Sequence, residues 1–115
     1  MMTDEEKKAR IRELNDELRT KGHALNGRFV AVGGLINEDQ EKRLRVFEAA
    51  AAFDAWTTGD DPYGEHDFGK FTVDGEDFMF KIDYYAIGDE AHGSEHPEDQ
   101  ATTIRVLTLM YAEDY

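Results

Sequence analysis

The residues best suited to chemistry are concentrated in one short stretch between a helical pattern and a hairpin pattern. It reads Asp61-Pro62-Tyr63-Gly64-Glu65-His66-Asp67-Phe68-Gly69, so a histidine and three carboxylates lie among turn-forming residues. A carboxylate beside an imidazole fixes its tautomer and raises its basicity, as in a general acid–base pair. The same stretch could instead form a structural corner, in which the aromatic rings cover the core and His66 and Asp67 bond to loop amides.

A hairpin directly after this stretch predicts where its side chains point. Asp74-Gly75 stands between two runs that alternate apolar and polar residues, which indicates a type I′ turn with Val73 paired to Glu76. This register predicts one buried face and one outer face of the sheet. The buried face comprises Phe71, Val73, Phe78, Phe80, Ile82 and Tyr84, and the outer face comprises Lys70, Met79, Lys81, Asp83 and Tyr85.

Extended backwards, the same register places His66 opposite Asp83 and Phe68 opposite Lys81. This pairing gives an enzymatic hypothesis, in which His66 is a general base and Asp83 or Asp67 orients it. The side chains that would place a substrate or stabilise developing charge are Tyr63, Tyr85 and Lys81. No recognisable nucleophile accompanies the histidine, and the chain has no cysteine, which excludes thiolate catalysis and cysteine-bound zinc.

Two further histidines, His92 and His96, have the spacing of metal ligands on one turn of a helix. They lie in the polar, acidic segment 88–100, where Gly93 and Pro97 oppose a helix and indicate an exposed loop. We therefore predict no metal site and no cofactor.

Periodicity predicts two helices and four strands. A capping box over Thr3–Glu6 begins an amphipathic helix within residues 1–22, and a second helix is expected from Asn37 to Trp56. Strands are expected at 28–32, 71–73, 76–85 and 102–111, although the last segment also suits a helix. The prediction is a single α+β domain over residues 1–115 in the order α-β-α-β-β-β, with an antiparallel sheet of about four strands and helices on one face.

Charge is strongly asymmetric along the chain. The formal net charge is −13, yet residues 1–45 contain ten Lys/Arg and nine Asp/Glu. Residues 46–115 contain three Lys/Arg and 17 Asp/Glu, so the second part carries the whole excess. Such a surface repels nucleic acid and attracts basic surfaces, so we expect a protein partner with a basic surface and no direct binding of nucleic acid.

The start of the chain is charged, and no apolar run approaches the length of a membrane span. The sequence therefore predicts neither a signal peptide nor a membrane anchor, and the lack of cysteine fits the cytoplasm.

Three segments have distinctive residue content: Pro62–Gly69 (PYGEHDFG), Lys81–Tyr85 (KIDYY), and Arg105–Met110 followed by the acidic Glu113-Asp114-Tyr115. In these segments the chain resembles a family of small bacterial domains of unknown function, found in genomes and mobile elements. The resemblance covers roughly residues 9–115. It implies no activity, substrate or catalytic residue, and it directs attention to mobile elements, where small acidic proteins block nucleic-acid-handling machinery.

Charge and resemblance together predict an acidic protein-interaction domain. It would occupy a basic channel of a nucleic-acid-binding complex as a DNA-mimic inhibitor, for example as an anti-CRISPR protein on a CRISPR effector. The acids expected to contact the partner are Asp60, Asp61, Glu65, Asp74, Glu76, Asp77, Asp89, Glu90, Glu95, Glu98 and Asp99. The motif residues expected to shape the site are Tyr63, Gly64, His66, Asp67, Phe68, Lys81, Asp83 and Tyr85.

Overall fold

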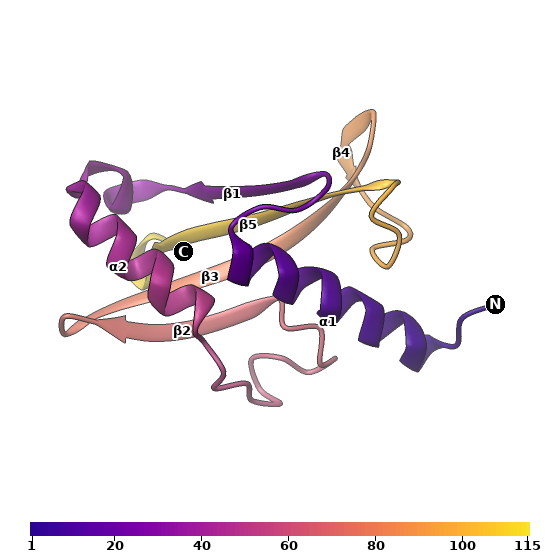
Figure 1. Ribbon diagram of the computed structural model, residues 1–115, viewed down its shortest axis with the longest axis horizontal. Coiled ribbons are helices and arrows are strands. Elements are labelled where there is room, and N and C mark those ends of the chain that lie inside the picture. The colour runs from indigo at the N-terminus through magenta and orange to yellow at the C-terminus, as the bar shows by residue number, and fades with distance from the viewer.

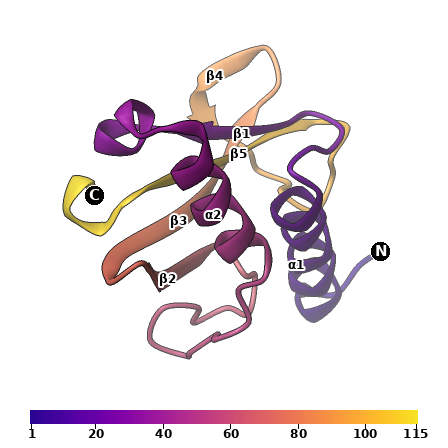
Figure 2. The same cartoon turned by 60° about the vertical axis from the view of Figure 1, so that its left-hand side comes forward.

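The computed structural model describes residues 1–115 and confirms an α+β fold. Its helices are α1 (Asp4–Lys21) and α2 (Gln40–Ala51). Its strands are β1 (Gly27–Ala31), β2 (Phe68–Val73), β3 (Glu76–Ala86), β4 (Asp89–Gly93) and β5 (Thr103–Tyr111), and two 3-10 turns, η1 (Gly33–Asn37) and η2 (Ala112–Asp114), complete the chain. Figures 1 and 2 show both helices on the same side of the sheet, as predicted.

The sheet is mixed and has five strands rather than four, in the order β1-β5-β3-β2 with β4 paired to β3. β5 lies between β1 and β3, and its side chains are mostly buried on both faces, so the strand prediction for 102–111 is confirmed and the helix alternative is wrong. β1 runs parallel to β5, which corrects the prediction of an antiparallel sheet. The whole domain separates these two strands in sequence, so no tight turn constrains their relative direction.

The β2–β3 hairpin has the predicted register throughout, from Val73 opposite Glu76 to Phe68 opposite Lys81. Asp74 and Gly75 both adopt the left-handed backbone that a type I′ turn requires, with φ angles of 53° and 79°. Met79 departs from the prediction, because it lies on the outer face yet is only 1% exposed. The turn after β5 folds over that part of the outer face.

The capping box of α1 is present as predicted, and the helix buries Ile11, Leu14 and Leu18 against the domain. α2 departs from the prediction at its start. Asp39 rather than Asn37 caps it by accepting a hydrogen bond of 2.8 Å from the amide of Lys42. The segment before Asp39 is the separate turn η1.

α2 also ends at Ala51, five residues before the predicted end at Trp56. The Arg19 guanidinium occupies the end of the helix by binding the carbonyls of Ala50, Ala51 and Phe53. The chain beyond Ala51 then turns so that the rings of Phe53 and Trp56 pack edge-on against Phe80, with ring centroids 5.6 and 6.0 Å away. The apolar run that suggested a longer helix therefore packs as an irregular segment.

Residues 89–93 form β4, which corrects the prediction that 88–100 is entirely loop. Gly88 has φ 84°, so the chain can reverse after β3 and pair Asp89 with Ala86. All five residues of β4 are exposed, as expected for that segment. Neither helix of the fold combines the length and the apolar run needed to cross a bilayer.

Gly69 provides a test of how tightly the hairpin packs on the core. A Cβ atom at this position would lie 2.5 Å from Phe80 and 2.7 Å from Phe53. We expect Gly69→Ala to lower the free energy of unfolding by about 2 kcal/mol, because both rings would have to shift. Urea denaturation measures this change, with Gly59→Ala as the control. A Cβ at Gly59 has no neighbour nearer than 4.0 Å, so equal effects of the two substitutions would contradict the packing described here.

Candidate functional site

The structure turns His66 away from the sheet and towards α1. Its backbone is left-handed, with φ 58°, so the β register stops at Phe68 and does not extend to His66. The His66 Nδ1 atom lies 2.8 Å from the Asp16 carboxylate, while Asp83 pairs with Lys81 at 2.8 Å. The predicted contact between His66 and Asp83 is therefore wrong, and its cause is a change of backbone conformation two residues before the strand.

The His66 ring is held on several sides. It stacks on Trp56 with ring centroids 3.8 Å apart and an angle of 4° between the planes. The His66 amide donates to Asp61 at 3.1 Å, and the Nε2 atom lies 3.9 Å from the same carboxylate. The His66 side chain is only 19% exposed and lines none of the larger hollows of the surface. This arrangement fastens the loop before β2 to the body of the domain.

Asp16 and Arg19 complete this corner from α1. Asp16 accepts hydrogen bonds from both His66 and Arg19, so its carboxylate connects the imidazole to the guanidinium. The Arg19 Nη1 atom donates to three carbonyls at the end of α2, at distances of 2.8 to 3.2 Å. A cation at the carboxyl end of a helix interacts favourably with the helix dipole, so Arg19 stabilises α2 where the helix stops.

A second buried network lies next to this corner. Asn15 is fully buried, and its Nδ2 atom donates to the Glu65 carbonyl at 3.0 Å and to the Tyr84 hydroxyl at 2.8 Å. Its Oδ1 atom accepts from Arg105 Nε at 2.6 Å, and Tyr84 donates to the Glu65 carboxylate at 3.1 Å. Burial raises the pKa of Tyr84 and lowers the pKa of Arg105. The motif residues Glu65 and Tyr84 are thus tied to α1 and β5.

Four of these residues were not predicted from the sequence: Asn15, Asp16, Arg19 and Arg105. The available signal was position. Asn15 and Arg19 are four residues apart and directly follow Leu14 and Leu18 of the apolar stripe, so they lie at the edge of the buried helix face. Arg105 is the only charged residue in β5, a strand that is buried on both faces.

Asp67 carries the most perturbed carboxylate of the motif. The pKa of Asp67 is raised from 3.8 to about 6. Burial is the main cause, and the negative charges of Glu65, Asp61 and Asp83 add to it. Its backbone carbonyl continues the hairpin by accepting the Ile82 amide at 2.8 Å. A carboxylate held against its ionisation preference beside a histidine is a recognised mark of functional sites, and such a group also affects stability.

The raised pKa of Asp67 predicts that its carboxylate lowers the stability of the fold at neutral pH and not at acidic pH. The native state binds the Asp67 proton more tightly than the unfolded state does, so this stabilising contribution is present below about pH 4 and is lost as the pH rises through about 6. We expect Asp67→Asn to raise the free energy of unfolding by about 1 kcal/mol at pH 7.5 and by about a third of that at pH 4.5, because Asp67 is only partly buried and the unfolded state is already partly ionised at the lower pH. Urea denaturation at both pH values measures this difference. Asp54→Asn, at an exposed carboxylate of the same connection, is the control, and a gain for Asp67→Asn that does not depend on pH would contradict the assignment.

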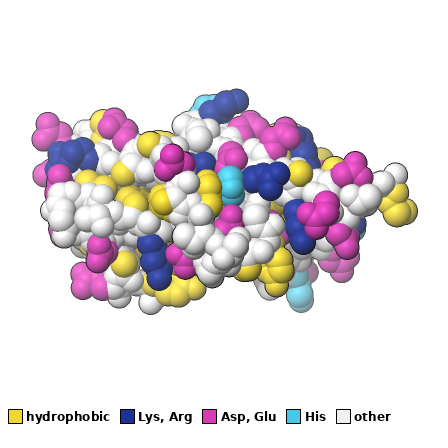
Figure 3. Space-filling model, turned by 90° about the horizontal axis from the view of Figure 1, so that it is seen from below, with side chains coloured by type: hydrophobic (Ala, Val, Ile, Leu, Met, Phe, Trp, Pro, Cys, Tyr) yellow, Lys and Arg dark blue, Asp and Glu magenta, His cyan; other side chains and the backbone are white.

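The eleven acids predicted to contact a partner fall in three separate places rather than on one face. Asp74, Glu76 and Asp77 lie at the β2–β3 turn, Asp60, Asp61 and Glu65 lie in the loop before β2, and Asp89, Glu90, Glu95, Glu98 and Asp99 lie on β4 and the loop after it. The β2–β3 turn and β4 are at opposite ends of the molecule in Figure 1. On the face drawn in Figure 3, Asp and Glu side chains are scattered among Lys and Arg side chains rather than gathered in one patch.

Several of these acids have partners within the protein. Asp61 is only 7% exposed and bonds to the His66 amide, so it is not available to an external surface. Three others pair with basic residues: Asp74 with Arg45, Glu76 with Lys42, and Glu90 with Arg28. The number of acids free to meet a partner is therefore smaller than the sequence suggested.

The two histidines of the acidic segment also have acidic neighbours. His92 lies 2.7 Å from Asp89, and His96 lies 3.3 Å from Glu98. They are on a strand and a loop rather than on one helix. No group of three or more His, Asp or Glu side chains in the fold is arranged to hold a metal ion.

One hollow at the β2–β3 end collects acids from two distant segments. Glu76 and Asp77 of β3 and Glu113 of η2 line a hollow of about 300 Å³. Lys42 neutralises Glu76, whereas Asp77 accepts a bond only from the Thr72 hydroxyl and Glu113 has no ion pair. Two acids from distant segments, Asp77 and Glu113, thus lie at this hollow without a Lys or Arg partner.

A family model described as "Protein of unknown function (DUF3768)" matches residues 31–114. The matched residues contain the motif stretch, the hairpin, β5 and the acidic hollow. α1, which supplies Asn15, Asp16 and Arg19, precedes them. No curated protein and no solved structure matches the chain.

Proposed function

We propose that this chain, which belongs to the DUF3768 family of proteins of unknown function, is an acidic interaction domain that binds a basic surface of a nucleic-acid-handling protein. The supporting observation is the uncompensated negative charge of its second part. Of the 17 acids in residues 46–115, only Asp74, Glu76, Asp83 and Glu90 contact Lys or Arg. The remaining field attracts basic surfaces and speeds the encounter with them.

The acidic hollow is the part of this surface best suited to specific contact. Asp77 and Glu113 are exposed and have no basic partner, and they come from segments that the fold brings together at one end of the sheet. Carboxylates presented at fixed positions can take the place of phosphates in a basic channel, because both are anionic acceptors for Lys and Arg. In this proposal the other acids contribute long-range attraction.

The concrete form that we favour is a cytoplasmic inhibitor that mimics DNA, such as an anti-CRISPR protein. The resemblance of PYGEHDFG and KIDYY to domains from mobile elements supports this form, because mobile elements encounter host systems that act on nucleic acid. The partner would be a CRISPR effector or another nucleic-acid-binding complex. The domain itself would bind no nucleic acid, since its net charge repels phosphates.

Affinity capture from bacterial lysate at low and moderate ionic strength tests this function. We expect the wild-type domain to retain a nucleic-acid-binding complex that added DNA displaces and that salt weakens. The double variant Asp77→Lys with Glu113→Lys should retain at most about a tenth as much, because two attractive contacts become repulsive.

The control is Glu48→Lys with Asp54→Lys, which changes the net charge equally at exposed positions outside the hollow. It should retain the complex at close to the wild-type level at moderate ionic strength. Capture that DNA does not displace, or equal loss in the two double variants, would count against a specific acidic contact at the hollow.

A second candidate is a small enzyme that uses His66 as general acid or base, with Asp67 as its neighbouring carboxylate. The raised pKa of Asp67 favours this candidate. The contacts of His66 replace Asp83 by Asp16 as the orienting group. Asn tolerates the left-handed backbone of this position, so His66→Asn removes the imidazole without adding backbone strain, although the ring's contacts with Trp56 and Asp16 are lost. If the His66→Asn variant keeps the full biological effect of the wild-type protein, the hypothesis of an enzyme that uses His66 is excluded.

A further inference from the structure

The face of the sheet opposite the helices is covered in part by the last residues of the chain, Ala112–Tyr115, and is otherwise uncovered. Figure 2 shows α1 and α2 on one side of the sheet and the turn after β5 at its end. On the other side Met79 and Met110 are 1% and 4% exposed, although no helix lies over them. The β2–β3 hairpin and the segment Ala112–Tyr115 therefore form the two sides of a groove on this face.

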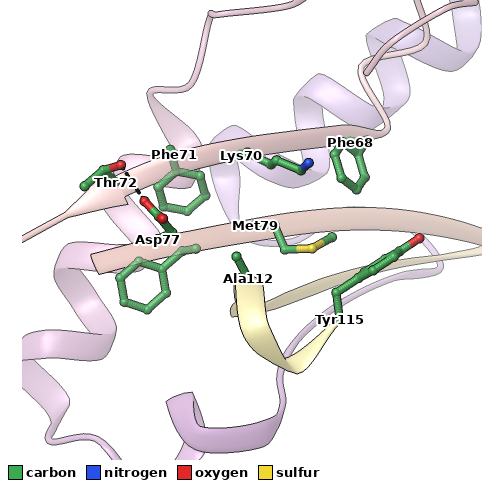
Figure 4. A pocket seen from close by; sticks show the side chains of 9 residues that line it. Phe68, Lys70, Phe71, Thr72, Asp77, Met79, Ala112 and Tyr115 are labelled. Carbon is green, nitrogen blue, oxygen red and sulfur yellow. Dashed lines mark hydrogen bonds between the residues drawn. The ribbon is translucent and has the colours of Figure 1, made fainter. Parts of the chain in front are cut away.

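The groove is lined mainly by apolar and aromatic groups. It has a volume of about 530 Å³, and its lining includes Phe68, Met79, Ala112 and Tyr115. The rings of Phe68 and Tyr115 meet edge-on at one end, with centroids 6.2 Å apart. Figure 4 shows these side chains gathered around one hollow. Tyr115 is 75% exposed, so much of its ring faces solvent in the absence of a partner.

The charges at the two ends of the groove differ. Asp77 belongs both to this groove and to the adjoining acidic hollow with Glu76 and Glu113. At the other end the Lys70 ammonium lies 5.7 Å from the centre of the Phe68 ring, where a cation–π interaction holds it. The groove thus joins an apolar section to an end with unneutralised negative charge.

We propose that this groove is the specific part of the interaction surface and receives an apolar side chain from an extended basic segment of the partner. Lys or Arg residues beside that side chain would bind Asp77 and Glu113, while the apolar side chain packs on Phe68 and Tyr115, above the buried Met79. This inference rests on the proposed function and adds to it the chemistry of the recognised segment. Charge complementarity selects this occupant.

Two other occupants fit the groove less well. A second copy of the chain would bring another net charge of −13 to the same place, which opposes association. A small molecule usually requires a cavity that encloses most of its surface, whereas this groove is partly open to solvent and suits an extended segment.

A titration followed by NMR tests the proposal with defined probes. The first probe is the capped peptide Lys-Arg-Phe-Arg-Lys, and the second has serine in place of phenylalanine and the same charge. We expect the phenylalanine peptide to bind about tenfold more tightly, because one aromatic side chain becomes buried. The methyl signal of Met79 should shift with the phenylalanine peptide and much less with the serine peptide.

Two variants locate the apolar contact. Tyr115→Ala removes an exposed wall of the groove, and Ala112→Trp fills the groove, so each should reduce the preference for phenylalanine to about twofold or less. Tyr63→Ala removes another exposed tyrosine, 65% exposed and outside the groove, and should leave the preference unchanged. Wild-type affinities that are equal for the two peptides, or a preference that survives in both groove variants, would overturn the proposal.

The charge contact is tested separately. Asp77→Asn with Glu113→Gln should weaken both peptides by a similar factor and preserve the preference for phenylalanine. If neither peptide binds the wild-type protein at low ionic strength, the proposed function fails together with this inference. If both peptides bind equally and the charge variant weakens both, only the groove assignment fails.

Discussion

The Arg19 guanidinium, buried against the end of α2, is the interaction on which the arrangement of this domain depends. It binds three carbonyls at that end and the Asp16 carboxylate, and it lies over the Trp56 ring. These contacts fix the packing of α1 on α2 and the direction in which the chain leaves α2. The loop that carries His66 can therefore lie only where Asp16 and Trp56 hold it.

Burial of so many polar groups is stable only because nearly all of them are satisfied. Asn15 uses its amide nitrogen and its carbonyl oxygen in three hydrogen bonds, and only the Nε atom of Arg19 lacks a partner among the buried side-chain atoms. Removing one member would leave a buried donor or charge unpaired, which costs more than the bond itself contributes. The residues around His66 thus act as one unit, and this favours a structural role for most of the motif.

Local patterns were sufficient to predict the hairpin, the start of α1 and the strand β5. In each case neighbouring residues decide the outcome, as Asp74-Gly75 does for the turn and Thr3 with Glu6 does for the cap. The position of His66 was not predictable in this way. A single left-handed residue ended the register, and the groups that stabilise it come from α1, some fifty residues earlier in the chain.

The early end of α2 has the same explanation, because Arg19 is remote in sequence and its effect on the helix depends on the tertiary fold.

The acidic surface was predictable as a total charge but not residue by residue. Composition established that the second part is acidic, but it could not distinguish the internally bonded Asp61 from the exposed Asp77. Only the contacts of the folded chain show which acids are bonded within the protein and which can meet a partner.

The central place of β5 has a consequence for how the chain folds during synthesis. β5 follows all the other strands in sequence, yet it lies between β1 and β3 in the sheet. While the ribosome is still making the chain, β1 has no strand to pair with and β3 has only the hairpin side, so the core that these strands cover stays open. Formation of the sheet must wait for β5, and its long-range pairings make it slow compared with the local β2–β3 hairpin. During that interval the acidic character of the nascent chain helps to keep it soluble, because like charges oppose association of its unpaired strand edges.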